Sequence, residues 1–325
     1  MYDSIIILGP TASGKTSLSI ELAKELKTEI INADSMYIYI GLDIGTAKPT
    51  IEEMKNIKHH LISFVEPSKN FSVSDYRQYA EKSIQIIRDK NMCPIIVGGT
   101  GFYIDSLIKN YSYGNTIKNE TIRKELEEEL NTFGKEYLYE KLKKIDYQSS
   151  QKIHFNDTKR VIRALEICLS SNQKKSEIIN SNNVILQNPL IIGLDVPREK
   201  LYEKINKRVD IMMQNGLLEE VKALYISGLN PENSNAMKGI GYKELISYIK
   251  GEVSLNDAIE KIKQHSRNYA KRQLTWFRRN ENIIWINPEE KNIVNKILNL
   301  YRNWDIKFYI ITIINFLRKR ILKQN

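Results

Sequence analysis

The sequence of 325 residues has little cysteine and no long apolar run. Its two cysteines, Cys93 and Cys168, lie far apart without a CxxC pair, so we expect buried thiols, no disulfide framework and no zinc site. No window supplies the roughly 18 to 20 apolar residues of a membrane-spanning helix. The longest candidate, residues 306–317, is short and includes Lys307 and Asn315. Since the N-terminus also lacks a signal-peptide pattern, we expect a cytoplasmic protein that does not enter a membrane.

Positive charge, in contrast, is in excess. The chain has 49 Lys and Arg against 39 Asp and Glu, which gives a net charge of +10. Such an excess indicates either a polyanionic partner, such as nucleic acid, or a lysine-rich surface that serves solubility. The hydrophobic fraction of 42% and the charged fraction of 27% are those of a globular protein. Composition alone leaves both interpretations of the charge open.

The most specific motif is GPTASGKT at residues 9–16. It matches G-x-x-x-x-G-K-T and lies between a β-branched run at 4–8 and a helical pattern at 17–26, which is the context of a P-loop. Backbone N–H groups of such a loop hold a diphosphate, Lys15 neutralises its charge, and the Thr16 hydroxyl contacts Mg²⁺. The predicted diphosphate site consists of Gly9, Pro10, Thr11, Ala12, Ser13, Gly14, Lys15 and Thr16, and Thr16 is the predicted metal ligand.

Three further apolar runs, at residues 29–33, 93–97 and 190–194, predict strands that end in polar or glycine-rich residues. The carboxyl ends of parallel strands lie at one edge of a sheet, so the loops that follow these strands should meet at one crevice. We therefore predict an α/β fold with a P-loop NTPase-like parallel sheet flanked by helices.

The segment at residues 121–183 shows amphipathic helical patterns and no convincing strand before its last residues, which predicts a mainly α-helical insertion domain. After residue 197 the pattern is helical almost to the end. The predicted domains are the first part of the P-loop core at 1–116, the helical insertion at 117–188, the second, mostly helical part of the core at 189–302, and a C-terminal extension at 303–325.

Two side chains at predicted strand ends are candidates for chemistry. Asp34 should point into the crevice beside the P-loop, where it suits a general base, although a turn cap or an indirect magnesium contact explains it equally well. Thr100, within the GGTG sequence at 98–101, can donate to a phosphate oxygen, but a tight turn also explains its glycines. The adjacent His59 and His60 precede a strand-like run and should point to opposite faces, which favours structural histidines over a metal site.

The densest basic segment, residues 262–279, interleaves six Lys and Arg residues with Tyr269, Trp276 and Phe277. Cations with stacking surfaces suit nucleic acid, and no acidic residue interrupts the run, which favours binding over a packed helix with a solvated basic face.

Two weaker basic segments occur elsewhere. A helical pattern at 157–166 places Lys159 and Arg163 on one face with Arg160 beside them, which suits a phosphate backbone or a solvated surface. The KGIGYK sequence at 238–243 is a second basic, glycine-rich loop.

Taken together, these residues resemble the bacterial-type tRNA dimethylallyltransferases, also called tRNA isopentenyltransferases. The resemblance is collinear from the N-terminus to about residue 300. It rests on GPTASGKT at 9–16, DSM at 34–36, GLDIGTAKP at 41–49, HHLI at 59–62, VGGTGFY at 97–103, RVIRALE at 160–166, GIGYKE at 239–244 and YAKRQLTWFRR at 269–279. Many enzyme classes share the P-loop, whereas DIGTAKP and AKRQLTWFR in this order are specific.

The resemblance implies transfer of a dimethylallyl group from dimethylallyl diphosphate to N6 of the adenosine 3′ of the anticodon in tRNA. It implies that residues 9–16 hold the diphosphate with Mg²⁺, that Asp34 takes the N6 proton, and that Thr100 and Arg208 hold diphosphate oxygens while the carbon–oxygen bond breaks. The adenine must leave the anticodon-loop stack, and the helical insertion would bind the anticodon stem-loop. We expect a monomer.

The tRNA contacts implied by the resemblance coincide with the basic segments. They are Asp34, Ser35, Met36, Tyr37, Thr100, Arg123, Lys159, Arg160, Val161, Ile162, Arg163, Lys238, Gly239, Ile240, Gly241, Tyr242, Lys243, Lys271, Arg272, Gln273, Leu274, Thr275, Trp276, Phe277 and Arg278.

The sequence departs from the family at two places. Tyr37 stands where many members have Gln, and the tail at 303–325 extends past their usual end, where we favour a packed terminal helix over a membrane-surface helix or a dimer contact. Two other functions are compatible with a P-loop: a nucleoside or small-molecule kinase that uses Asp34 as its base, and an RNA-binding module without catalysis.

Overall fold

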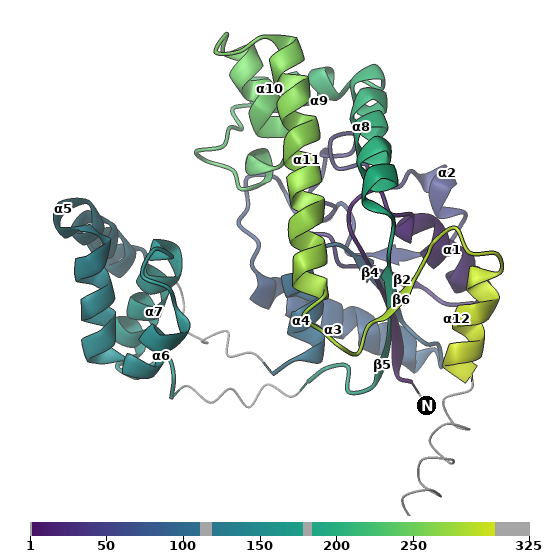
Figure 1. The fold of residues 1–325 in the computed structure, drawn as a ribbon, viewed down its shortest axis with the longest axis horizontal. Coiled ribbons are helices and arrows are strands. Elements are labelled where there is room, and N and C mark those ends of the chain that lie inside the picture. The colour runs from purple at the N-terminus through teal and green to yellow at the C-terminus, as the bar shows by residue number, and fades with distance from the viewer. Residues whose placement is uncertain (1, 111–118, 178–183, 303–325) are drawn as a thin grey trace, which may run out of the picture. The chain divides into compact units, whose positions relative to one another are not determined.

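The computed structural model describes residues 2–110, 119–177 and 184–302, which form two compact units (Figure 1). Unit 1 contains Met1–Ile108 and Ile185–Asn325, and unit 2 contains Lys109–Val184. The tail at 303–325, with its apolar run at 306–317, lies outside the described residues. Among the helices that are described, none has both the length and the apolar character that crossing a bilayer requires.

Unit 1 is built around a six-stranded parallel sheet with strand order β3-β2-β4-β1-β5-β6. The strands are β1 Ser4–Leu8, β2 Ile30–Asn32, β3 His59–His60, β4 Ile95–Gly98, β5 Pro189–Leu194 and β6 Ile284–Ile286. This confirms the predicted α/β class. The strands of such a sheet are buried on both faces, and all five residues of β1 are buried.

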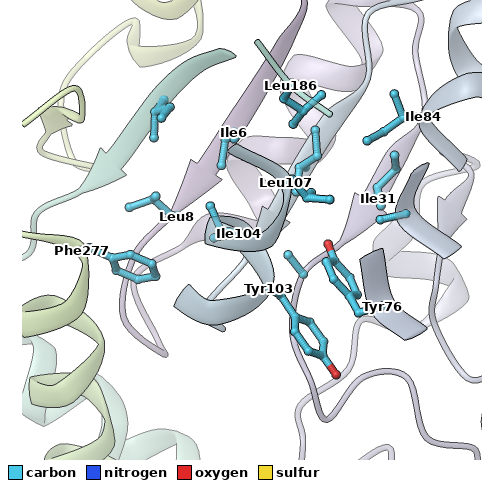
Figure 2. Close-up of a cluster of buried hydrophobic side chains, with 14 of the residues drawn as sticks. Ile6, Leu8, Ile31, Tyr76, Ile84, Tyr103, Ile104, Leu107, Leu186 and Phe277 are labelled. Carbon is cyan, nitrogen blue, oxygen red and sulfur yellow. The ribbon is translucent and has the colours of Figure 1, made fainter. Parts of the chain in front are cut away.

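Helices cover both faces of the sheet (Figure 1). Those of unit 1 are α1 Lys15–Leu26, α2 Ile51–Met54, α3 Val73–Asp89, α4 Gly101–Ile108, α8 Arg198–Gln214, α9 Leu217–Ile226, α10 Tyr242–Ile249, α11 Leu255–Phe277 and α12 Ile293–Arg302, with a 3₁₀ turn at Ala236–Lys238. Successive strand residues point to opposite faces, so Ile6 and Leu8 of β1 pack toward α3, α4 and Phe277 (Figure 2), whereas Ile5 and Ile7 pack toward α1 and α12.

A third apolar cluster connects the four helices α8, α9, α10 and α11 with the segment that follows β2. It includes Ile38 and Leu42 from that chain and Leu217, Val221 and Tyr242 from α9 and α10. This cluster fixes the loop after β2 against helices from the second half of the chain. The candidate active site is formed by residues of this loop and of these helices.

Two details of the sheet differ from the prediction. Strand β6 is not among the predicted strands. Its three residues form a strand by pairing with Ile192, Gly193 and Leu194 of β5, a contact that the local sequence does not indicate. The strand-like run after the two histidines is not a strand. Leu61 and Ser63 have φ values of 62° and 49°, which extended backbone does not allow, so β3 ends at His60.

The described residues of unit 2 form the helices α5 Glu120–Ile145, α6 Tyr147–Lys152 and α7 Thr158–Ser171. Helix α5 breaks at Gly134, where φ is 83°, and its two halves pack on α7 through Leu126, Leu142 and Leu165. A mainly helical insertion is therefore confirmed. The compact unit spans residues 109–184, compared with the 117–188 of the prediction.

Candidate active site

The P-loop follows β1 and ends at Gly14, whose φ of 89° places it in the left-handed region directly before α1. No side chain caps the N-terminus of α1, and its first turn contains no acidic residue. The free N–H groups and the positive end of the helix dipole therefore remain available to an anion. The buried Ser13 hydroxyl also lacks a hydrogen-bond partner within the described residues, which fits a loop built to hold an oxygen-rich ligand.

Lys15 begins α1 and faces back over the loop. Its Nζ donates a 2.7 Å hydrogen bond to the carbonyl oxygen of Pro10. Burial lowers the pKa of Lys15 to about 8, although the nearby Asp34 carboxylate acts in the opposite direction. An anion in this loop would therefore be attracted less strongly at mildly alkaline pH, where Lys15 loses its charge.

We expect the affinity for inorganic pyrophosphate to fall as the pH rises above about 8, by at most about tenfold per pH unit, because only protonated Lys15 attracts the anion. Titration calorimetry between about pH 7 and pH 9 measures this effect. The Lys15→Arg variant stays charged throughout, so it isolates the titration of pyrophosphate itself. Identical pH profiles for the two proteins would contradict the prediction.

Asp34 lies just beyond β2, and local hydrogen bonds fix its position. Its backbone N–H donates to Asn32 Oδ1 at 2.9 Å, and its own Oδ1 accepts from the backbone N–H of Met36 at 2.9 Å. One carboxylate oxygen thus caps a turn, while Oδ2 has no hydrogen-bond partner among the described residues. The turn-cap and general-base interpretations are therefore compatible, because different oxygens serve them.

Arg208 reaches the site from α8. Its Nη1 donates to Thr11 Oγ1 at 3.2 Å, and its Nη2 donates to the carbonyl oxygens of Thr46 and Ala47 at 3.4 and 3.2 Å. The guanidinium is thus held beside the P-loop by a loop that follows β2. A cation fixed in this way can neutralise charge on an anion in the P-loop without first having to reorganise.

Thr100 is a predicted ligand of the diphosphate, but its hydroxyl contacts Ser35 in the loop after β2. Its Oγ1 accepts from the backbone N–H of Ser35 at 2.9 Å and lies 3.2 Å from Ser35 Oγ. Its hydroxyl therefore supports the residue next to Asp34, and Thr100 lines neither of the two cavities described below. A bond from Thr100 to a diphosphate oxygen stays a prediction.

Gln273 of α11 connects two of the loops. Its Oε1 accepts from the backbone N–H of Thr11 at 2.9 Å, and its Nε2 donates to the carbonyl oxygen of Gly99 at 2.8 Å. A Cβ at Gly99 would overlap Gln273 Nε2, so this approach requires glycine. Gln273, a predicted tRNA contact, is only 5% exposed, and its side chain joins the P-loop to the loop that follows β4.

Two cavities at this edge of the sheet share several lining residues. The larger, of about 620 Å³, is lined by the P-loop, Asn32, Tyr37 and part of α8. The smaller, of about 330 Å³, is lined by Ser35, Met36, the loop at 238–243 and Arg272. The residues that line both are Thr11, Asp34, Thr46, Arg208 and Met212. Asp34 and Arg208 therefore stand between the cavity that the P-loop lines and a cavity with a basic rim.

Two of the predicted tRNA contacts, Phe277 and Tyr242, have side chains that are buried in the core of unit 1. Phe277 is 3% exposed and packs with Ile6 and Leu8, so it offers no stacking surface. Tyr242 is fully buried. Tyr37, in contrast, is half-buried and lines the larger cavity, and its hydroxyl donates to the carbonyl oxygen of Ala47 at 2.9 Å.

The remaining predicted positions on α11 and its neighbouring loop include an exposed basic set. The exposed basic residues are Lys238, Lys243, Lys271, Arg272 and Arg278, and the uncharged Thr275 is also exposed. Trp276 is half-buried, and its Nε1 donates to Asp105 Oδ2 at 3.1 Å. The alternation of buried and exposed positions along α11 means that this segment is both a packed helix and a basic surface.

Unit 2 shows the same division along α7. Lys159 and Arg160 are exposed, whereas Val161 and Ile162 are 1% and 5% exposed and pack in the core of the unit, so their side chains are not available to RNA. Arg163 forms an ion pair with the buried Glu166 at 3.0 Å. Arg123 on α5 forms an ion pair with Glu127 at 3.1 Å.

The histidine pair has structural contacts. His60 Nε2 lies 2.6 Å from Glu29 Oε2, and His59 Nδ1 lies 2.8 Å from the carbonyl oxygen of Ile57. These contacts agree with structural histidines. In the part of the chain that the structure describes, no group of three or more His, Cys, Asp or Glu side chains could hold a metal ion. Cys93 and Cys168 are both free, and Cys168 is buried.

Comparison with known proteins identifies the family. The family model described as IPP transferase matches residues 37–280. The tRNA dimethylallyltransferase of Acetivibrio thermocellus is 47% identical over 318 residues, which cover 96% of this chain and 98% of that protein. The enzyme of the same name from Clostridioides difficile is 47% identical over 297 residues, or 91% and 94% of the two chains.

Solved structures agree. The full-length tRNA isopentenylpyrophosphate transferase of Bacillus halodurans superposes with a TM-score of 0.70 at 40% identity, covering 97% of this chain and all of that one. A eukaryotic dimethylallyltransferase acting on tRNA superposes with a TM-score of 0.82 at 28% identity, covering 94% and 80%. Because these matches extend over most of the chain, the protein belongs to the IPP transferase family, that of the tRNA dimethylallyltransferases.

Proposed function

We propose that this protein transfers the dimethylallyl group of dimethylallyl diphosphate to N6 of the adenosine 3′ of the anticodon in tRNA, releasing diphosphate. The observation that carries the proposal is the meeting of the two cavities at Asp34 and Arg208. One cavity suits a diphosphate, the other has cationic residues on its rim, and the residues that line both stand where the two substrates would meet. Two relatives named tRNA dimethylallyltransferase, which the chain matches over 98% and 94% of their length, support the same activity.

On the donor side, the N–H groups of the P-loop and Lys15 would bind the diphosphate. Arg208, held by Thr11, Thr46 and Ala47, would neutralise negative charge that builds up as the bond between the dimethylallyl carbon and the diphosphate oxygen breaks. The electron pair of that bond leaves with the diphosphate. This use of a P-loop differs from phosphoryl transfer, because the bond breaks on the carbon side of the oxygen.

On the acceptor side, N6 of the adenine would form the new bond to the dimethylallyl carbon and lose a proton. Asp34 Oδ2 is the acceptor that we propose for this proton, since Oδ1 is occupied by the backbone N–H of Met36. The adenine must first leave the stack of the anticodon loop, which requires less free energy in a loop than in a duplex.

We propose Mg²⁺ as the metal of the donor side. Thr16 lines the larger cavity, and the described residues contain no group of three or more His, Cys, Asp or Glu side chains that could hold a metal ion by themselves. So few protein ligands fit Mg²⁺, which keeps several waters and binds phosphate oxygens. When bound beside Thr16, it would add positive charge next to the leaving diphosphate.

For tRNA, we propose that each unit contributes its own exposed cations. Those of unit 1 are Lys238, Lys243, Lys271 and Arg272, and unit 2, with Lys159 and Arg160, would bind the anticodon stem-loop. A tRNA substrate is also the reason to propose a cytoplasmic location. The monomeric state stays a prediction.

The direct test is incubation with dimethylallyl diphosphate, Mg²⁺ and unmodified tRNA, followed by nucleoside mass spectrometry. We expect N6-(dimethylallyl)adenosine. Phosphoryl transfer from ATP without this product would favour the kinase alternative, and tRNA binding without any product would favour a binding module.

The double variant Lys271→Ala with Arg272→Ala should bind tRNA more weakly and with a smaller salt dependence. Each lost phosphate contact reduces the slope of log K against log salt by about 0.7 to 0.9. Filter binding over a range of salt concentrations measures both quantities. Lys24→Ala with Lys27→Ala removes the same charge from exposed positions at the far end of α1 and should leave the slope unchanged. Equal slopes for the two double variants would refute the assignment.

A further inference from the structure

A hydrogen-bond centre lies at the half-buried side chain of Glu220, which lines neither cavity. Glu220, in the first turn of α9, accepts the backbone N–H groups of three consecutive residues: Asp43 at 2.9 Å and Ile44 at 2.7 Å on Oε2, and Gly45 at 3.0 Å on Oε1. Its Oε1 also accepts the hydroxyl of Tyr242 at 2.7 Å. One carboxylate thus joins the loop after β2 to α9 and α10.

The packing around this centre leaves little freedom. A Cβ at Gly45 would lie 2.7 Å from the Tyr242 hydroxyl and 2.8 Å from Leu217 Cδ1, so only glycine allows the loop to approach so closely. Tyr242 is fully buried, and burial together with the neighbouring Glu220 raises its pKa. The phenol therefore remains protonated and acts as the donor.

The loop that Glu220 holds continues directly into the contacts of Arg208. The carbonyl oxygens that accept from Arg208 Nη2 belong to Thr46 and Ala47, the two residues that follow Gly45. The loop is also tied at Lys48, whose Nζ donates to the Tyr39 carbonyl oxygen, to Asp43 Oδ1 and to Ser63 Oγ at 2.6 to 2.7 Å. A shift at residues 43–45 would therefore move the acceptors that orient the guanidinium.

We propose that Glu220, with Tyr242, is a positioning residue that acts through Arg208. It holds the backbone of residues 43–47 so that two carbonyl oxygens keep the Arg208 guanidinium at the junction of the two cavities. This inference rests on the proposed function, in which Arg208 neutralises the leaving diphosphate.

The chemistry requires a carboxylate at this position. Four donors point at the two oxygens of Glu220, and an ionised carboxylate only accepts. In Glu220→Gln one oxygen becomes an NH₂ group, which would face two of these donors and break their hydrogen bonds. The substitution keeps the size and shape of the side chain, so it tests the hydrogen bonds rather than the packing.

The test is a double-mutant cycle between Glu220→Gln and Arg208→Ala, with Glu219→Gln as the matched control, because Glu219 is exposed on the same helical turn. For each protein we would measure kcat for dimethylallyl transfer, the Kd for inorganic pyrophosphate with Mg²⁺, the Kd for tRNA and the Tm. We expect Glu220→Gln to lower kcat by about 10- to 100-fold, as misplaced catalytic groups do, with unchanged tRNA affinity. In the Arg208→Ala background it should have no further effect.

Equal losses from Glu220→Gln in the wild-type and Arg208→Ala backgrounds would overturn the inference, because they would indicate a general structural role. If Glu220→Gln does not fold, Tyr242→Phe removes one of the four hydrogen bonds and keeps the ring. It should give a smaller loss of kcat, also absent in the Arg208→Ala background.

The Kd for pyrophosphate distinguishes a failure of this inference from a failure of the proposed function. If the wild type makes no prenylated product but binds pyrophosphate, the proposed function is wrong. The double-mutant cycle, measured on the Kd for pyrophosphate, then still decides whether Glu220 acts through Arg208. A wild type that does not bind pyrophosphate overturns both.

Discussion

Asp34→Asn should lower kcat for dimethylallyl transfer by about 10²- to 10⁴-fold, the usual contribution of a positioned general base. The amide keeps an oxygen that can accept the Met36 N–H, so the turn after β2 should persist. What is lost is the basic Oδ2 at the junction of the cavities. Single-turnover kinetics with labelled dimethylallyl diphosphate measures the chemical step, and a filter assay verifies that tRNA affinity is retained.

The matched control is Asp75→Asn. Asp75 also accepts a backbone N–H, that of Ser72 at 2.8 Å, but it lines neither cavity. Its replacement should affect only the stability of α3, with kcat unchanged. Prenylation by Asp34→Asn at the wild-type rate would exclude Asp34 as the base.

Arg208→Ala should lower kcat by about 10²- to 10³-fold, which is the typical loss when one preorganised group that stabilises transition-state charge is removed. The guanidinium is the cation that lies at the junction and is fixed by three oxygen acceptors from two loops. The Kd for pyrophosphate should rise as well, because the product retains the charge that Arg208 neutralises. Pre-steady-state kinetics and calorimetry measure the two effects.

Arg208→Lys distinguishes charge from geometry. Lysine keeps the positive charge but cannot donate to Thr11 and to both loop carbonyl oxygens through a planar fork, so we expect only partial recovery. Lys207→Ala, the neighbouring cation on α8, lines neither cavity and should have wild-type activity. Full activity of Arg208→Ala would remove Arg208 from the mechanism.

Features that depend on neighbours in sequence were readable from the chain. The P-loop requires a strand, a glycine-rich turn and a helix within a short segment, and the apolar runs of β1, β2, β4 and β5 are long enough to show their pattern. Asp34 was identified for the same reason, since a polar residue directly after a buried strand must lie at the edge of the sheet. Arg208 came only from the family resemblance, because nothing in the local pattern of α8 distinguishes it.

Tertiary structure alone decided which side chains turn inward and which loops meet. Phe277, Tyr242 and Val161 read as members of basic segments, but each is buried. The Gln273 bridge from Thr11 to Gly99 and the Glu220 bridge to residues 43–45 join segments more than 170 residues apart. Long-range hydrogen bonds leave no periodic pattern in sequence, because they depend on how helices pack on the sheet. The sequence by itself thus determined the fold class, the phosphate loop and the family, whereas only the packing of α8 to α11 against the loop after β2 brought the two cavities together at Asp34.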